Sequence, residues 1–378
     1  MNTQLAPTYQ YMFGDFWVFW FSSSNRYSVV EASLKTLLDT YLSSYSTEQF
    51  KSSLLTQKLS DDPEVIQQQL EAYLTTCNTP EETHGVSSDV AIDVSKRHIL
   101  KTYALGNKHF RIYYDSELVL KTIHPAMAHL ETKDQLDLAM VFDLYLHNDQ
   151  LHLFKNRRLI KRVAKRKYHL IQGKFVMELI CQLHDKTEDH WIGTFHGSAI
   201  SDSKSAILFV GNSGSGKSTL CTLLMAYGYE LLADDVTPLL AADNELYRNP
   251  LAVSLKEGAF GLLEAEFDDF KDLPEILFNR QKGRLKYLPG KAPHKSHYPC
   301  RAIVKVNYQS KSSTLLEEIS VKTILETFIP DSWLSPDPKH AKQFLEWLSQ
   351  QQFYQLTYSD TTSAIKTLSN VFESAERH

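Results

Sequence analysis

The residues with the clearest chemistry lie in one short segment, Gly211–Ser218, which reads Gly-Asn-Ser-Gly-Ser-Gly-Lys-Ser. It matches the P-loop pattern GxxxxGK[ST]. In such a loop the glycines let backbone N–H groups turn toward an anion, and the following helix adds the positive end of its dipole. Lys217 is predicted to reach the β- and γ-phosphates of ATP, and Ser218 to ligate Mg²⁺. The predicted nucleotide-binding residues are Gly211, Asn212, Ser213, Gly214, Ser215, Gly216, Lys217, Ser218 and Thr219.

Two carboxylates, Asp234 and Asp235, end the apolar segment Leu231–Ala233, the first of them 17 residues after Lys217. A strand that returns beside the P-loop strand would bring both carboxylates to the phosphate end of the sheet. One can hold Mg²⁺, and we assign Asp234 to this role together with Ser218. The other can accept a proton from an attacking hydroxyl, and we favour Asp235 as this base. The residue types alone leave open which of the two is the base, and a plain turn or helix cap is the alternative for both.

The order of these motifs resembles the HPr serine kinase/phosphorylase family, which shares a fold with phosphoenolpyruvate carboxykinase. The family has a His-Gly or His-Ala pair before the P-loop strand, a GxSGxGKS loop and a GxxLxADD return, which correspond here to His196-Gly197, Gly211–Ser218 and Gly228–Asp235. The segment Asn249–Gly258 is similar to the later PxxxxLK stretch of related kinases. The resemblance is specific over residues 195–258. It implies an α/β fold with a P-loop kinase core and a mixed sheet over residues 90–378.

The resemblance also implies roles for individual residues. His196 matches the family's histidine near the phosphate site, and Lys256 matches a later lysine that neutralises the transferring phosphoryl group. With Lys217, Asp234 and Asp235 they form the predicted catalytic set. A histidine at a strand end and an exposed lysine are the alternatives. The Arg- and Gly-rich catalytic loop of the bifunctional family members has no clear copy here, so HPr itself is not the expected acceptor.

These motifs predict an ATP- and Mg²⁺-dependent kinase that transfers the γ-phosphoryl group to a hydroxyl, with serine of a ribosomally made peptide or a protein as the acceptor. One alternative is a small-molecule kinase, for example on free serine. Another is a non-catalytic nucleotide-binding partner in a peptide-maturation complex. Arg280, Arg284 and Lys286 form a basic loop that could clamp the γ-phosphate or the substrate, or could simply face solvent.

Residues 1–80 are predicted to form a separate small α+β domain of winged-helix-like type. Phe16–Phe21 has the aromatic and β-branched composition of a strand. Three helices should follow, the first capped by Ser28 and Glu31, the second over Thr47–Leu55 and the third opening at Asp62-Pro63. Residues 10–77 resemble the PqqD-like peptide-recognition domain, in which a leader peptide adds as a strand at the sheet edge. The resemblance implies a leader-peptide partner, and a helical domain that merely docks on the kinase core is the alternative.

The remaining elements that must position these residues are predicted from periodicity. Gly106-Asn107 and Asn148-Asp149 each join two alternating segments, which indicates two hairpins. Ala206–Val210 is wholly apolar and is typical of a central buried strand. We expect helices over residues 175–183, 321–328, 339–350 and 362–372, a strand over 353–357 and a linker over 77–88.

Composition excludes several classes of protein. The chain has 378 residues, 43% of them hydrophobic, and a formal net charge of −5, which disfavours a globally basic nucleic-acid binder. Its four cysteines lie far apart and no apolar run is long enough to span a bilayer, so we expect a cytoplasmic protein without a disulfide framework. Residues 155–167 hold eight basic side chains, for which we expect a solvated hairpin and helix edge, with binding of an acidic peptide or nucleic acid as the alternative. By its resemblance to HPr kinases the chain is expected to form a homo-oligomer.

Overall fold

The structure is a computed structural model that describes residues 3–59, 62–80, 90–134, 138–279 and 283–373. These residues form four β-sheets and the helices that cover them, so the predicted mixed α/β class is confirmed. Most of the predicted linker lies outside the described residues. Among the described helices, no helix has both the length and the apolar character needed to cross a bilayer.

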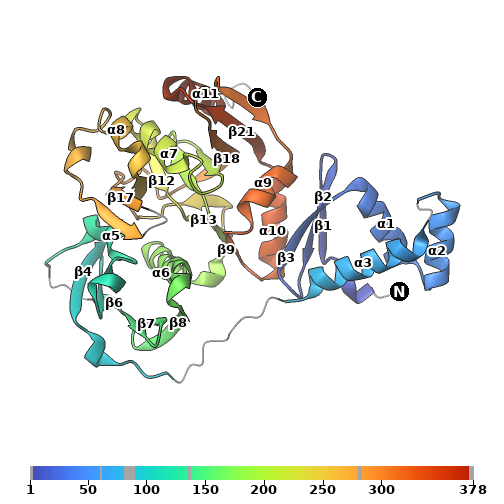
Figure 1. Ribbon diagram of the computed structural model, residues 1–378, viewed down its shortest axis with the longest axis horizontal. Helices are drawn as coiled ribbons and strands as arrows, with labels where there is room; N and C mark the ends of the chain where they lie inside the picture. The colour runs from blue at the N-terminus through green and yellow to red at the C-terminus, as the bar shows by residue number, and fades with distance from the viewer. Residues whose placement is uncertain (1–2, 60–61, 81–89, 135–137, 280–282, 374–378) are drawn as a thin grey trace.

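The N-terminal unit is a three-stranded antiparallel sheet followed by three helices (Figure 1). Its strands are β1 (Tyr9–Phe13), β2 (Phe16–Phe21) and β3 (Arg26–Glu31), and its helices are α1 (Ala32–Ser43), α2 (Thr47–Thr56) and α3 (Pro63–Asn78). The predicted Ser28 and Glu31 cap is wrong, because both residues lie in β3 and the Glu31 side chain caps nothing. The β-branched Val29 and Val30 extend the strand by pairing with β2.

A five-stranded sheet follows in the order β4-β5-β6-β7-β8. The strands β5 and β6 run parallel and the other neighbours run antiparallel. Both predicted hairpins are confirmed, and residues 155–167 run largely along the edge strand β8, most of whose residues are partly buried. The elements are β4 (Ile99–Leu105), β5 (Lys108–Tyr114), α4 (Glu117–Leu120), α5 (His124–Met127), β6 (Leu138–His147), β7 (Gln150–Lys155), β8 (Arg158–Ala164) and α6 (Tyr168–Leu183).

The central element is a ten-stranded mixed sheet with the path β12-β10-β11-β18-β14-β13-β9-β20, extended by β21 and β19 beside β18. Among the described strand pairs of this sheet, only β11–β18 and β18–β21 are parallel. Its strands are β9 (Trp191–Phe195), β10 (Ser198–Ser201), β11 (Ala206–Val210), β12 (Glu230–Ala233), β13 (Thr237–Leu240), β14 (Glu245–Tyr247), β18 (His297–Tyr308), β19 (Leu315–Glu318), β20 (Trp333–Leu334) and β21 (Gln352–Tyr358).

Helices cover both faces of this sheet. Ile207 and Phe209 of β11 pack in one core with α7 (Lys217–Ala226) and α11 (Thr361–Glu373). Leu208 and Val210 pack in the opposite core with α9 (Val321–Phe328) and α10 (Pro338–Ser349). A strand buried on both faces must be apolar at every position, which explains the predicted character of β11. A small antiparallel sheet and one short helix complete the fold: β15 (Val253–Lys256), α8 (Phe260–Leu263), β16 (Ile276–Asn279) and β17 (Gly283–Leu288).

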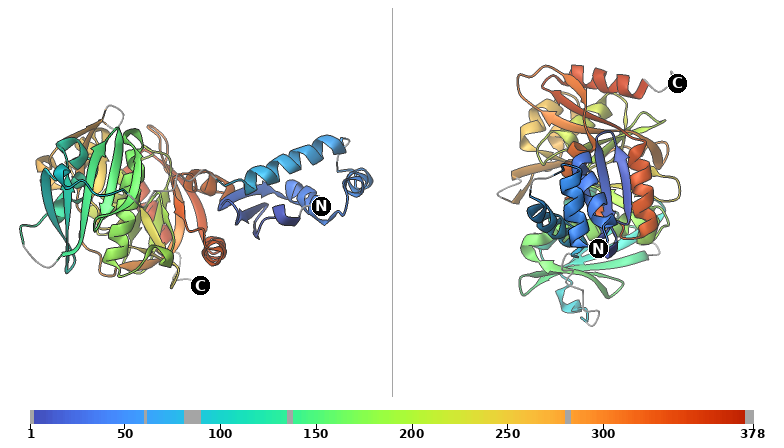
Figure 2. Two further views of the ribbon diagram at one scale, coloured as in Figure 1. Left: turned by 90° about the horizontal axis from the view of Figure 1, so that it is seen from below. Right: turned by 90° about the vertical axis from the view of Figure 1, so that its right-hand side faces the viewer.

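The N-terminal sheet is also covered on both faces. Phe19 and Phe21 of β2 pack against its own helices, whereas Val18 and Trp20 belong to the core that holds α9 and α10. Figures 1 and 2 show the unit at one end of the molecule, with its sheet against α10. The Asn25 amide donates to the backbone oxygen of Leu334 in β20 at 2.9 Å. The unit is therefore docked on the central domain rather than tethered loosely beside it.

Candidate active site

The predicted P-loop connects the end of β11 to the start of α7. Gly216 has a φ of +100° and lies directly before the helix. The left-handed backbone favours glycine here, and the space is tight, since an added Cβ would lie 3.1 Å from the Tyr358 hydroxyl and 3.3 Å from Tyr308. The backbone N–H of Tyr308 donates to the oxygen of Ser215 at 3.0 Å. The neighbouring strand β18 thus holds the loop in place.

Lys217 is the first residue of α7 and is buried. Its ammonium group donates to the backbone oxygens of Gly211 and Asn212, at 2.5 and 3.4 Å. Burial lowers its pKa, while the charges of Asp235 and Asp234 oppose this shift. The positive charge is therefore held inside the loop, where the loop's N–H groups would bind phosphate.

Asp234 follows β12 and ties three elements together. Its Oδ1 accepts hydrogen bonds from the hydroxyls of Ser198 in β10, at 2.6 Å, and Ser218 in α7, at 2.9 Å. Its Oδ2 accepts from the backbone N–H of Ser254 in β15 at 3.2 Å. Burial and then the charge of Asp235 raise the pKa of this carboxyl, and the three hydrogen bonds lower it. A hydroxyl and a carboxylate oxygen in contact are hard ligands that suit Mg²⁺, so Ser218 and Asp234 fit the predicted metal role.

Asp235 points to a different environment from its neighbour. Its side chain is 66% exposed, and its Oδ1 lies 3.3 Å from Nδ1 of His196. Its φ is +64°, and the N–H of Val236 donates across it to the oxygen of Asp234 at 2.7 Å. This left-handed turn sends two adjacent carboxylates in different directions. It supplies the physical distinction that the residue types lack: Asp234 has donors on both oxygens, whereas Asp235 is open to an incoming group.

His196 and Lys256 reach the same region from two other elements. His196 follows β9, and its backbone N–H donates to the Ser332 hydroxyl at 3.0 Å. Lys256 ends β15, and its ammonium donates to the hydroxyl of Ser213 in the loop at 3.1 Å. All five predicted catalytic side chains therefore lie around the phosphate loop and the acidic pair.

The basic loop does not act as a unit. Arg280 lies outside the described residues. Arg284 is exposed, and its guanidinium lies 3.4 Å from Glu275. Lys286 is buried, and its ammonium donates to the backbone oxygens of Phe270 and Lys271, both at 3.0 Å. The suggested phosphate clamp is thus wrong for Lys286, because it holds the segment before β16.

Several residues at the site lie outside the sequence motifs that predict it. Ser198 and Ser254 both bind Asp234. The buried Asn249 donates its amide to the oxygen of Val236 at 2.9 Å and so holds the segment after the acidic pair. Burial raises the pKa of Tyr287, opposite Ser254 in the small sheet, to about 12, so it stays protonated. The one sequence signal for Ser198 is a hydroxyl in an otherwise buried strand, which needs a partner.

Comparison with known proteins adds little. No family model and no curated protein matches the chain. Among solved structures, it is similar to the Hpr(Ser) kinase/phosphatase from Coxiella burnetii, with 13% identity and a TM-score of 0.25 over 48% of this chain and 92% of that one. A TM-score this low says nothing about the activity of this chain, which we infer from the geometry of its site.

Proposed function

We propose that the chain is an ATP- and Mg²⁺-dependent kinase that transfers the γ-phosphoryl group to a hydroxyl, with serine of a peptide or protein as the acceptor. The observation that carries the proposal is the division between Asp234, buried against Ser218, and Asp235, exposed beside His196. Nucleotide binding alone needs no second carboxylate in a left-handed turn beside the phosphate loop.

Each residue then has a defined task in the transfer. The loop N–H groups and Lys217 bind the phosphates, and Ser218 and Asp234 would hold Mg²⁺, which neutralises charge on them. Asp235 accepts the proton of the acceptor hydroxyl while the hydroxyl oxygen bonds to the γ-phosphorus. The bond from this phosphorus to the β–γ bridging oxygen breaks, and ADP departs with the electron pair. His196 orients Asp235, and Lys256 offsets charge on the transferring group.

The N-terminal unit is proposed to recruit the peptide, which rests on the resemblance of residues 10–77 to PqqD-like domains. An added strand needs an open sheet edge. Among the described residues, no strand pairs with the outer edge of β3. Helix α3 lies beside this edge, because the Tyr73 hydroxyl donates to Ser28 at 2.8 Å and Arg26 donates to the oxygen of Thr76 at 2.8 Å. An extended leader peptide would therefore pair with β3 and contact α3.

The transfer is tested by incubating the protein with ATP, Mg²⁺ and serine-containing candidate peptides, with free serine in parallel, followed by mass spectrometry. A mass gain of one phosphate on peptide serine is expected. Asp235→Asn should abolish this gain while leaving ATP affinity unchanged. Asp269→Asn, a change at an exposed aspartate, should alter neither the phosphorylation nor the ATP affinity. Phosphorylation of free serine alone would identify a small-molecule kinase. Tight ATP binding without any transfer would identify a non-catalytic partner.

The recruitment step has its own measurement. Hydrogen exchange of the protein with and without a candidate leader peptide should show new protection in β3, because an added strand takes up its free N–H groups. The hairpin β4–β5 in the five-stranded sheet serves as an internal control and should not change. Protection elsewhere, with β3 unaffected, would contradict the assignment of the peptide to this edge.

A further inference from the structure

A cavity of about 350 Å³ lies between the end of α6, the end of β14 and the start of β18. His297, in its wall, is the first residue of β18, whereas Tyr308, the last residue, contacts the phosphate loop. At about 3.3 Å per residue, the strand places these two ends roughly 35 Å apart. The cavity is therefore separate from the candidate active site.

Arg248 lines this cavity and contributes a positive charge to its wall. Its backbone is fixed on both sides, since its N–H donates to the oxygen of Ser296 at 2.8 Å and its oxygen accepts from Nε2 of His184 at 2.8 Å. The side chain is half-buried, and within the described part of the chain its guanidinium has no carboxylate partner. Burial lowers its pKa with no opposing acidic neighbour. Arginine is seldom taken out of water without an anion beside it.

A second cation lines the same cavity. Lys186 is half-buried, and its ammonium is also without an acidic partner among the described residues. The acidic residue in the wall, Asp185, is already paired with the ammonium of Lys108. Two positive charges of the cavity thus remain uncompensated.

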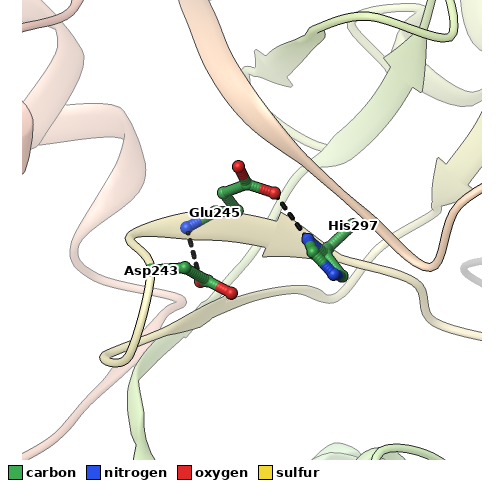
Figure 3. A group of neighbouring side chains, drawn as sticks. All are labelled: Asp243, Glu245 and His297. Atoms are coloured by element: carbon green, nitrogen blue, oxygen red, sulfur yellow. Dashed lines mark hydrogen bonds and ion pairs between the residues drawn. The ribbon is translucent and has the colours of Figure 1, made fainter.

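The neighbouring group of Asp243, Glu245 and His297 offers ligand atoms within 4.8 Å of one another, which raises the alternative of a metal ion. Figure 3 shows that these side chains are already engaged. Asp243 accepts from the N–H of Glu245 at 3.0 Å and from the Tyr247 hydroxyl at 2.6 Å, and Glu245 lies 2.5 Å from Nδ1 of His297. Of this group only His297 lines the cavity, together with Arg248 and Lys186, and these two positive charges favour an anion there.

We propose that this cavity binds a small dianion, a phosphate monoester or a dicarboxylate, between the Arg248 guanidinium and the Lys186 ammonium. The planar guanidinium presents parallel N–H groups that match two oxygens of a carboxylate or phosphate, and the ammonium supplies the second positive charge. The volume lies in the range of small-molecule sites. The proposal is independent of the kinase activity.

The test is calorimetric titration of the full chain with inorganic phosphate and, separately, with malonate. Arg248→Gln and Lys186→Gln should each weaken binding of the preferred anion roughly tenfold or more, because each loses a charge-assisted contact. The matched control is Lys339→Gln, which removes an exposed charge on α10 and should leave the affinity unchanged. Phosphate bound at the loop would contribute equally to all four proteins. The anion that responds to the two substitutions identifies the ligand class.

Thermal unfolding gives a second readout. The preferred anion should raise the unfolding temperature of the wild-type chain but not that of Arg248→Gln. Without anion, Arg248→Gln should be at least as stable as wild type, because it removes a partly desolvated charge that has no carboxylate partner among the described residues. Equal affinity of wild type, Arg248→Gln and Lys186→Gln for both anions would overturn the proposal, as would the absence of binding at millimolar concentration. If Arg248→Gln does not fold, Lys186→Gln alone decides.

Discussion

Replacing Ser198 by alanine tests whether the hydrogen bonds to the Asp234 carboxylate lower its pKa and stabilise its ionised form. Ser198 is fully buried, and its hydroxyl donates to Oδ1 of Asp234 at 2.6 Å. Two donors to this carboxylate remain, Ser218 and the N–H of Ser254. A hydrogen bond to a charged group contributes about 1.5–3 kcal/mol, so the native state should lose stability of this order at neutral pH.

The loss should depend on pH in a defined direction. Burial already raises the pKa of Asp234 above its ordinary value, and the lost donor raises it further. A carboxyl with a raised native pKa destabilises the folded protein when it is ionised, and this penalty is relieved as the pH falls through the native pKa. The stability difference between Ser198→Ala and wild type should therefore shrink on acidification. Neutral Asp234 is a poor metal ligand, so the acid limb of the pH–rate profile should move to higher pH.

The assays are thermal unfolding across a pH series and the pH–rate profile of phosphoryl transfer. Ser201→Ala is the matched control, since Ser201 is equally buried on the same strand but accepts a hydrogen bond from the N–H of Ser203 at 2.9 Å. Its effect should not vary with pH in this way. An unchanged acid limb in folded Ser198→Ala, or a stability difference that grows on acidification, would refute the reasoning.

Three further predictions follow from the fold. Gly216→Ala should abolish measurable ATP binding in calorimetry, because its Cβ would meet Tyr358 and Tyr308 at a φ of +100°; retained affinity would contradict the assigned loop geometry. Lys286→Met should lower thermal stability but leave the turnover of folded protein unchanged, because the Lys286 ammonium binds the backbone oxygens of Phe270 and Lys271 and none of the phosphate-loop residues. Removal of residues 1–80 should reduce solubility, as measured by light scattering, because it uncovers the α10 surface on which Tyr27 packs against Phe344; a monodisperse truncated chain would count against a structural role for the docked sheet.

The phosphate loop could be predicted because its chemistry is local. A strand, a glycine-rich turn and a helix are consecutive in the chain, and their residue types are dictated by backbone geometry. The acidic pair could be predicted as a pair but not divided into roles. That division depends on a left-handed turn at Asp235 and on donors from β10, α7 and β15, which only the tertiary fold brings together.

Other predictions failed for reasons of tertiary context. Ser28 and Glu31 have the spacing of a helix cap, but cross-strand pairing with β2 prevailed over this local preference. Lys286 looked like part of a basic surface, yet its ammonium reaches buried backbone oxygens of a segment 15 residues away. The local sequence does not predict the strands β1 and β3. Side chains on one face of each strand pack in the core that holds α9 and α10, and these helices lie far along the sequence.

The shared packing of the N-terminal sheet has a consequence for synthesis of the protein on the ribosome. The face that carries Val18 and Trp20 emerges about 300 residues before α9 and α10, which cover it. At ~5–20 residues per second, the nascent sheet would wait roughly 15–60 s with this aromatic face unprotected. Its helices α1 to α3 can already fold on the opposite face during this interval. A half-covered sheet of this kind is a natural substrate for a chaperone until translation reaches residue 349.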